Sequence, residues 1–361
     1  MPKASIVSEP RAPSHATMEL RPNAKREIDL MRRMLVLSGV LIALIVTACS
    51  TPTTNSTQVE ESSSPTPTIT KEINPVSLEA LSQKEFIGKD LKLEKILGEN
   101  SKFTRYYITY KSNDLLISGI MNVPKGEGPF PTLVLAHGYI DPEIYTTGRG
   151  LAREQKYLAE RGYVVLHTDY RNHAGSDKDP NSDINFRLGY TEDVINAALA
   201  LKNSRFEFVD KNRIGLLGRS MGGGIAFNSM VVKPGLFDAY VVFAPTSSNV
   251  VDNFNRWTKM NFEIVDQIQK TYGLPDENPE FWNAISAINY FDRVSEPVLI
   301  LHGTNDESCD IRWSETTTKA LQDAGKTVEF IKYEGERHAF SPRWQDSMEE
   351  TTRFFETYLK S

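Results

Sequence analysis

One serine stands between two glycines in the segment Gly218-Arg219-Ser220-Met221-Gly222, after an apolar run and before a run typical of a helix start. On a sharp turn between a strand and a helix, the serine oxygen stands clear of the backbone. Side chains two residues before and after it would collide there, which explains the glycines. The pattern predicts that Ser220 is a nucleophile. A phosphate-binding loop is the alternative, but no Gly-Lys-Ser or Gly-Lys-Thr follows.

A carboxylate and an imidazole follow this serine along the chain, each directly after an apolar run. Asp306 comes after Val298–Leu301, and His338 comes after Val328–Tyr333. A histidine can take the proton of a serine, and a carboxylate can orient that histidine and stabilise its charged form. The order serine, aspartate, histidine therefore predicts Ser220, Asp306 and His338 as a catalytic triad. Asp310 is the alternative acid, and helix capping is the alternative role for either aspartate.

Two backbone amides are expected to stabilise the oxyanion that such a serine would create. One is the amide after the nucleophile, on Met221, and the other belongs to the loop after the run Thr132–Ala136, where Tyr139 is the candidate. Gly138 lets this loop approach the serine. These donors act on charge that appears only in the tetrahedral intermediate. His137 precedes the serine, against the expected order, so we interpret it as a structural residue.

The elements that must position these residues are visible as short apolar or alternating runs. The later runs are apolar throughout, which is typical of strands buried on both faces of a parallel sheet. The first two flank a polar turn and indicate an antiparallel hairpin. The predicted strands are Tyr106–Tyr110, Leu115–Val123, Thr132–Ala136, Tyr163–Thr168, Arg213–Leu217, Ala239–Phe243, Val298–Leu301 and Val328–Tyr333.

Helical stretches alternate with these strands. Thr191–Leu201 carries Glu192 and Asp193, which would suit the first turn of a helix, and Arg312–Ala324 is followed by Gly325. Alternation of this kind predicts a mostly parallel, doubly wound sheet of about eight strands. Together with the serine turn and the order serine, aspartate, histidine, it indicates an α/β-hydrolase fold. Residues 245–296 are longer than a plain crossover, so we expect a small helical cap over the carboxyl edge of the sheet, where ligands bind.

The chain resembles the catalytic domain of the prolyl oligopeptidase group, which includes dipeptidyl-peptidases and acylaminoacyl-peptidases, over about residues 103–361. The resemblance implies Ser220, Asp306 and His338 as the triad and the Tyr139 and Met221 amides as oxyanion donors. It is carried by Leu135-Ala-His-Gly-Tyr, Thr168-Asp-Tyr-Arg, Val209-Asp-Lys-Asn-Arg-Ile-Gly-Leu-Leu-Gly-Arg-Ser-Met-Gly-Gly, Pro297-Val-Leu-Ile-Leu-His-Gly-Thr-Asn-Asp and Glu334-Gly-Glu-Arg-His-Ala-Phe.

The large peptidases of this group carry a β-propeller before the catalytic domain, and here the sequence departs from them. Four blades would need about 160 residues, whereas about 30 separate Val76 from the first strand. Peptidase specificity is therefore not carried over. We expect a serine hydrolase that cleaves an ester or a peptide bond through an acyl-enzyme. A carboxylesterase acting on acylated sugars or lipids is the alternative, and a non-catalytic surface binding lipoprotein is the alternative of another class.

Composition limits the partners. The formal net charge is −6, which disfavours a nucleic-acid partner. The two cysteines, Cys49 and Cys309, have no neighbours at zinc-site spacing, and the expected chemistry needs no metal and no cofactor. The expected partners are a small ester or short peptide and, through the N-terminus, a membrane.

The N-terminal part of the chain is typical of an export signal. Arg32 and Arg33 precede an apolar run over 35–48 that ends at Cys49, which resembles the bacterial lipoprotein signal in which the cysteine is acylated. An uncleaved anchor helix or a plain secretory signal are the alternatives. All three place the rest of the chain outside the cytoplasm, and lipidation at Cys49 would make it a membrane-anchored, extracytoplasmic lipoprotein.

The predicted domain organisation follows from these boundaries. Residues 1–30 fit no signal and are interpreted as extra residues upstream of the true start, and residues 31–49 form the signal. Ser, Thr and Pro make up 15 of the 21 residues over 50–70, so 50–75 is expected to be a disordered tether. The catalytic domain is then expected over 76–361.

Overall fold

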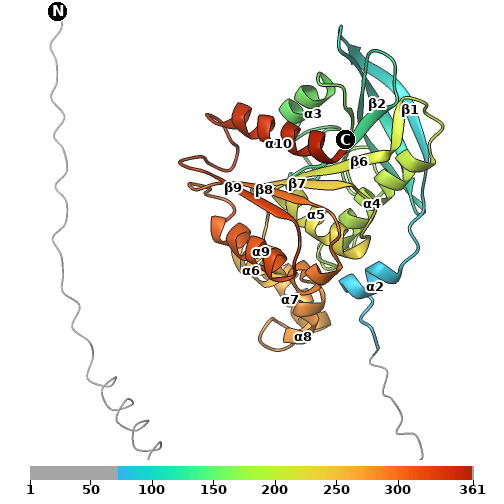
Figure 1. Ribbon diagram of the computed structural model, residues 1–361. Coiled ribbons are helices and arrows are strands. Elements are labelled where there is room, and N and C mark those ends of the chain that lie inside the picture. Colours follow the sequence, from blue (N-terminus) through green and yellow to red (C-terminus); the bar gives the residue numbers. More distant parts are fainter. Residues whose placement is uncertain (1–71, 360–361) are drawn as a thin grey trace, which may run out of the picture. The chain divides into compact units, whose positions relative to one another are not determined.

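A sheet of nine strands runs through the residues that the computed structural model describes, 72–359, in the order β1-β2-β3-β5-β4-β6-β7-β8-β9 (Figure 1). Its strands are β1 (Gly88–Glu99), β2 (Phe103–Ser112), β3 (Leu115–Pro124), β4 (Phe130–Ala136), β5 (Val164–Thr168), β6 (Val209–Arg219), β7 (Ala239–Phe243), β8 (Val298–Gly303) and β9 (Val328–Tyr333).

The sheet is antiparallel at one side and parallel at the other. β1, β2, β3 and β5 pair antiparallel, while β5, β4, β6, β7, β8 and β9 pair parallel. The carboxyl ends of the parallel strands meet at one edge, where ligands bind in such folds. Ser220, which follows β6, and Asp306 and His338, which follow β8 and β9, therefore come to the same edge.

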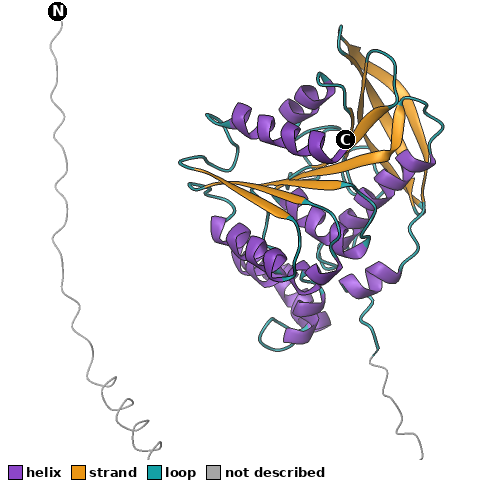
Figure 2. Cartoon of the chain, viewed as in Figure 1, coloured by secondary structure: helices purple, strands orange, loops and turns teal. Residues whose placement is uncertain are grey.

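Helices cover both faces of this sheet, as Figure 2 shows. Helices α4 (Leu188–Asn203) and α5 (Met221–Val232) pack on one face of the sheet, and α3 (Ala152–Ala159) and α10 (Trp344–Leu359) pack on the other. The helices α2 (Leu78–Gln83) and α9 (Ile311–Asp323) complete the described layers.

Two hydrophobic cores arise because successive strand residues point to opposite faces. In β4, Val134 and Ala136 belong to the core shared with α4 and α5, while Leu133 and Leu135 belong to the core shared with α3 and α10. The central strands are therefore apolar on both faces, and the fold is the predicted α/β-hydrolase fold.

The segment between β7 and β8 forms the expected helical cap. Its aromatic residues pack together, with the rings of Phe254 and Trp282 4.8 Å apart and those of Tyr272 and Phe281 4.3 Å apart. The cap consists of α6 (Val250–Arg256), the 3₁₀ turn η1 (Thr258–Met260), α7 (Phe262–Tyr272), α8 (Pro279–Ala284) and the 3₁₀ turn η2 (Ala287–Arg293).

Two details differ from the sequence-based expectation. The strand β1 was not predicted, and it is an edge strand whose residues are mostly exposed and show no regular alternation. Helix α4 begins at Leu188, so the expectation that Glu192 and Asp193 occupy a first turn is wrong, and both side chains instead pair with an arginine.

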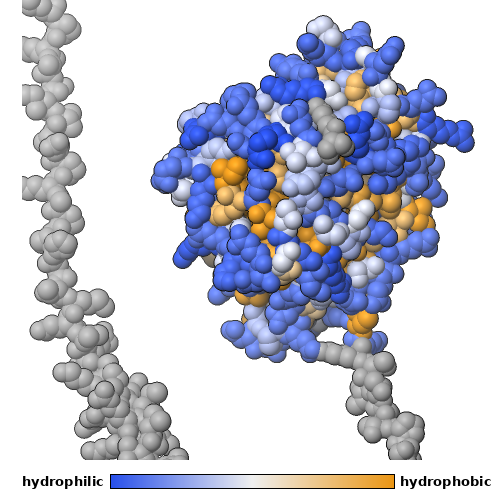
Figure 3. Space-filling view, viewed as in Figure 1, coloured by the Kyte–Doolittle hydropathy of each residue, from blue (hydrophilic) through white to orange (hydrophobic). Residues whose placement is uncertain are grey.

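The predicted signal at 31–49, with Cys49, the segment 1–30 and most of the predicted tether 50–75 lie outside the described residues. The surface in Figure 3 is mostly hydrophilic with separate apolar patches. None of the helices within residues 72–359 has the length and apolar character needed to cross a bilayer.

Candidate active site

Ser220 lies on a strained turn between the end of β6 and the start of α5. Its backbone has φ 56° and ψ −121°, a conformation that non-glycine residues rarely adopt. Surrounding hydrogen bonds hold it, because its N–H donates to Phe243 O at 3.0 Å and its carbonyl accepts from Gly223 N at 2.9 Å and Thr246 N at 3.0 Å. Strain held in this way is typical of a functional position.

The glycines around this turn are required by close backbone approach. A Cβ on Gly218 would lie 2.2 Å from Gly222 O, and one on Gly222 would lie 1.9 Å from Ala136 O. A Cβ on Gly138 would lie 3.1 Å from the Ser220 Cβ, so the loop after β4 also passes close to the serine. The physical reason for the predicted glycine pattern is thus present in the structure.

Asp306 and His338 are joined by a hydrogen bond. Nδ1 of His338 lies 2.8 Å from Asp306 Oδ2, and the Asp306 carboxylate is fully buried while the imidazole is 22% exposed. Asp306 Oδ1 accepts the backbone N–H groups of Ser308 at 2.8 Å and Cys309 at 2.9 Å. Burial acts to raise the pKa of Asp306, but hydrogen bonds from His302 and His338 outweigh it and hold the pKa well below its ordinary value.

Asp310, the alternative acid, has the other predicted role. Its side chain caps α9 by accepting from Arg312 N at 2.9 Å, and it also pairs with the Arg312 guanidinium. Asp306, rather than Asp310, is therefore the carboxylate in contact with His338.

Backbone hydrogen bonds join the loop that carries Asp306 to the loop that carries His338. Thr304 N donates to Tyr333 O at 3.0 Å and Asn305 N donates to Glu336 O at 2.9 Å. A Cβ on Gly303 would lie 2.3 Å from Glu336 O, so this glycine allows the two loops to meet.

Arg153 of α3 holds the other side of the histidine loop. Its guanidinium donates to Ala339 O at 2.8 Å and to Phe340 O at 3.3 Å, and it lies over the Trp344 ring. The loop after His338 is therefore held by a helix that is distant in sequence. This contact could not be predicted from the sequence, because it leaves no local pattern.

Tyr139 and Met221 both line the pocket that contains Ser220. Within residues 72–359, neither backbone N–H donates a hydrogen bond to another residue. Arg187 touches both residues, with its guanidinium over the Tyr139 ring at 4.8 Å and one nitrogen 3.9 Å from Met221 Sδ. The two amides thus stay available to a ligand beside the serine.

His137 lies under this loop as a structural residue. Its ring is fully buried and stacks on Tyr145 at 4.9 Å and Tyr170 at 4.3 Å between ring centroids. Burial lowers the pKa of His137 to about 3, so the ring is neutral at ordinary pH. The buried carboxylate of Asp169 accepts from the Tyr145 hydroxyl at 2.7 Å and from Gly148 N at 2.9 Å, which fastens the same loop.

The serine hydroxyl has an unexpected neighbour, because its Oγ lies 3.9 Å from Cys309 Sγ. Among the described residues it has no hydrogen bond to His338. Hydrogen bonds in unliganded active sites are often incomplete and tighten when substrate binds. Burial raises the pKa of Cys309 to about 12, so this thiol stays protonated and is a poor nucleophile.

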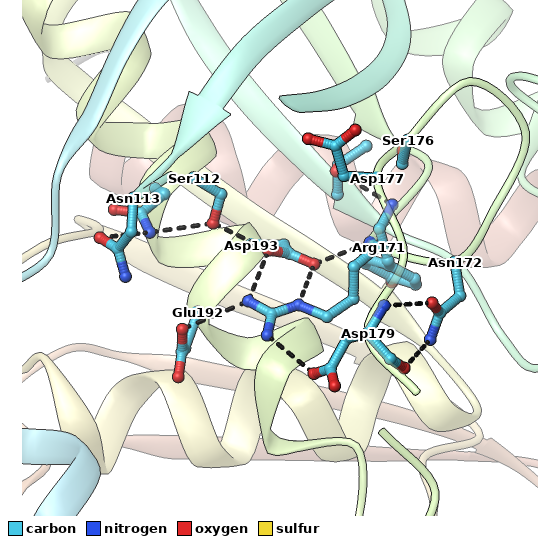
Figure 4. A network of polar contacts seen from close by, with 12 residues as sticks. Ser112, Asn113, Arg171, Asn172, Ser176, Asp177, Asp179, Glu192 and Asp193 are labelled. Atoms are coloured by element: carbon cyan, nitrogen blue, oxygen red, sulfur yellow. Dashed lines mark hydrogen bonds and ion pairs between the residues drawn. The ribbon is translucent and has the colours of Figure 1, made fainter. Parts of the chain in front are cut away.

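A buried arginine fixes the segment that leads to Arg187. Arg171 binds both carboxylate oxygens of Asp193 at 2.9 and 3.1 Å and also reaches Asp179 and Glu192, as Figure 4 shows. The Asp193 carboxylate further accepts from the Ser112 hydroxyl at 2.8 Å. A buried, bidentate pair of this kind is geometrically specific, and it ties the loop after β5 to α4.

The pocket around Ser220 has a volume of about 740 Å³ and extends under the cap. This size is in the range of about 300–1,000 Å³ that suits a small organic ligand. His338, Ser308 and the two oxyanion candidates line it together with residues of α5, α6 and α7. Within residues 72–359, no group of His, Cys, Asp and Glu side chains is arranged to hold a metal ion.

The model of the prolyl oligopeptidase family matches residues 150–361. Uncharacterized peptidase YuxL of Bacillus subtilis is 25% identical over 260 residues, which cover 69% of this chain and 38% of that protein. Uncharacterized peptidase YtmA of the same organism is 25% identical over 242 residues, 66% of this chain and 87% of that protein. The chain thus spans less than half of the larger relative.

Solved structures share the fold. An acylaminoacyl peptidase of Pyrococcus horikoshii superposes with a TM-score of 0.59 at 23% identity, over 72% of this chain and 42% of that one. Acetyl xylan esterase 1 of a Thermoanaerobacterium species also gives a TM-score of 0.59, at 17% identity, over 77% of this chain and 91% of that one. The same fold therefore carries peptidases and esterases.

Proposed function

The chain belongs to the prolyl oligopeptidase family, and we propose that it is a serine hydrolase with Ser220, His338 and Asp306 as its catalytic triad. The observation that carries the proposal is the 2.8 Å hydrogen bond between Asp306 and His338 beside the pocket that holds Ser220. The positive φ of Ser220 supports the nucleophile role, because it holds the residue on the turn where the hydroxyl must stand free.

In the proposed mechanism, His338 takes the proton of Ser220 as the hydroxyl attacks the carbonyl carbon of the substrate. The Tyr139 and Met221 amides donate to the developing oxyanion, and Asp306 stabilises the imidazolium. The tetrahedral intermediate collapses when His338 gives the proton to the leaving group, which leaves the acyl group on Ser220. Water then attacks the ester with His338 as base and releases the acid.

The substrate is proposed to be an uncharged ester or a blocked amide. Of the described residues that line the pocket, Asp183 is the one carboxylate, and it is paired with Arg187 at 2.7 Å. A free peptide amine would therefore find no unpaired carboxylate beside the serine. The acetyl xylan esterases among the structural neighbours and the acylaminoacyl peptidase are compatible with these two substrate types.

A serine-directed fluorophosphonate tests this proposal. We expect it to label the full chain and to abolish its hydrolysis of p-nitrophenyl esters. Ser220→Ala should lose both labelling and hydrolysis. Ser101→Ala, which changes an exposed turn between β1 and β2, should keep both and serves as the matched control. Labelling of Ser220→Ala, or hydrolysis that persists in it, would contradict the proposal.

A further inference from the structure

Under the proposed triad, the two sides of the pocket receive different parts of the substrate. His338 must protonate the leaving group, so the leaving group lies on the side of His338 and Ser308. The acyl group then takes the part of the pocket that is lined by α5, α6 and α7.

The lining on the cap side combines polar side chains, among them Asn228, Asn253 and Asn261, with an apolar wall. The wall consists of side chains from α5, α6 and α7 and from the loop before α4, namely Ile225, Val250, Phe254, Ile264, Ile268 and Phe186. Ile268 is fully buried although it lines the pocket, so the space reaches the interior of the cap. Contact with a hydrophobic wall of this depth contributes to binding free energy only when the ligand buries apolar surface against it.

The charged groups near this wall have partners, although Arg219 Nε forms no hydrogen bond among the described residues. Arg187 pairs with Asp183, and Arg219 donates to the buried Glu154 carboxylate at 2.6 Å. No lysine or glutamate is among the described residues that line the pocket. A cationic acyl group would therefore lose its hydration without gaining an unpaired carboxylate.

Apolar side chains also continue outside the pocket along the cap. Trp257 lines the pocket, and Met260 and Phe262 follow it with exposed fractions of 77% and 81%. Large apolar side chains exposed so fully beside a pocket commonly mark a place where an apolar ligand or partner contacts the surface.

From these observations we propose that the substrate's acyl group is bulky, apolar and uncharged, such as a medium-chain fatty acyl group, and that it fills the wall formed by α6 and α7. An acetyl group would leave most of the 740 Å³ empty and the wall without contacts. This inference rests on the proposed function and specifies its substrate class.

The test is the hydrolysis of p-nitrophenyl acetate, butyrate, hexanoate and octanoate by the full chain. We expect kcat/KM to rise with chain length by up to about fourfold for each methylene that becomes buried. In a parallel comparison of blocked aminoacyl p-nitroanilides, a phenylalanyl substrate should exceed an alanyl one. Acetate as the best ester, together with alanine as the better aminoacyl group, would overturn the inference.

Two variants locate the acyl group. Ile264→Trp fills the wall with a larger ring and should lower the ratio of octanoate to acetate hydrolysis by about tenfold or more, because overpacking excludes the longer chain. Gln267→Trp adds the same ring at an exposed position of α7 outside the pocket and should keep the ratio. Ile268→Phe provides a second filling variant, and thermal unfolding identifies any variant that does not fold.

The outcomes separate this inference from the proposed function. Equal effects of Ile264→Trp and Gln267→Trp on the chain-length ratio would overturn the inference while the proposed function stands. Absence of ester hydrolysis together with absence of fluorophosphonate labelling of the wild type would overturn the proposed function itself.

Discussion

At the scale of single residues, Asp306 has the most constrained environment of the site. Its carboxylate is fully buried, and the two oxygens accept from two backbone N–H groups and from His338, while His302 Nε2 lies 3.1 Å away. A buried carboxylate is tolerated only with such partners. The hydrogen bond to His338 also orients its imidazole, which is the role of the acid in the proposed triad.

Asp306→Asn should lower kcat by about 10,000-fold, because an amide cannot stabilise the imidazolium or fix the same tautomer of the histidine. Steady-state kinetics with a p-nitrophenyl ester measure this. Asp310→Asn serves as the control. It removes the charge of the residue at the N-terminal end of α9 and should change kcat little. Similar kcat values for wild type and Asp306→Asn would show that Asp306 has no part in the reaction.

The lowered pKa of Asp306 also predicts how stability depends on pH. Since the folded-state pKa lies below the unfolded value of about 3.9, this carboxylate contributes stability above that pH, and the contribution is lost as pH falls through the folded pKa. The unfolding free energy of wild type relative to Asp306→Asn should therefore shrink below about pH 4. Denaturant titrations at several pH values measure the difference, and a constant difference would contradict the assignment.

At the scale of elements, the site depends on loops held by partners distant in sequence. Ser220 follows β6, Asp306 follows β8 and His338 follows β9, and the parallel pairing of these strands brings the three loops to one edge. The loop of His338 is further held by α3 through Arg153, so the position of the imidazole depends on a helix from the first half of the domain.

Arg153→Met keeps most of the side-chain volume but removes both hydrogen bonds to the His338 loop. We expect kcat to fall by about tenfold with a small change in melting temperature, because Arg153 is 46% exposed and its bonds mainly order a loop. Arg161→Met, just beyond the C-terminal end of the same helix, removes a guanidinium that contacts Tyr157 rather than this loop. Equal losses in the two variants would indicate a general effect on α3.

Elements buried on both faces could be predicted from the sequence because their apolar runs are continuous. The runs Val298–Leu301 and Ala239–Phe243 lie in the strands β8 and β7. The edge strand β1 could not be predicted, since its residues are mostly exposed and three irregularities interrupt its pairing with β2. Partners such as Arg153 and Cys309 depend on tertiary contacts that leave no local pattern.

The predicted glycines of the serine turn were recognisable for a different reason. Gly218 and Gly222 are required by backbone atoms 2.2 and 1.9 Å from where a Cβ would lie, so their spacing is fixed by the turn itself. The predicted start of α4, Thr191, lies three residues after the observed start, Leu188. In the sequence, Glu192 and Asp193 look like the acidic residues of a first helical turn, but in the structure they pair with Arg171.

At the scale of the whole molecule, the sequence before residue 72 predicts where the enzyme works. We propose that Cys49 is acylated and holds the hydrolase outside the cytoplasm at a membrane. A single acyl chain binds membranes only weakly, whereas two or more chains give stable anchoring. An anchored enzyme with an apolar rim on its cap would meet acylated substrates near the same surface.

Cys49→Ser should move the protein from the detergent phase to the aqueous phase in Triton X-114 partitioning of expressing cells, without loss of specific activity toward esters. Cys309→Ser is not a suitable control, because it lies beside Ser220. Ser101→Ala, which leaves the signal intact, should stay in the detergent phase. Detergent partitioning that persists in Cys49→Ser would favour an uncleaved helix as the anchor.

The central claim is that Ser220 carries the acyl group during turnover. Rapid acid quenching during hydrolysis of a slowly deacylating ester, followed by peptide mass spectrometry, tests it directly. We expect the acyl mass on the peptide that contains Ser220, with no such adduct in Ser220→Ala. Turnover without any adduct on Ser220, or with the acyl group on a different residue, would contradict the account.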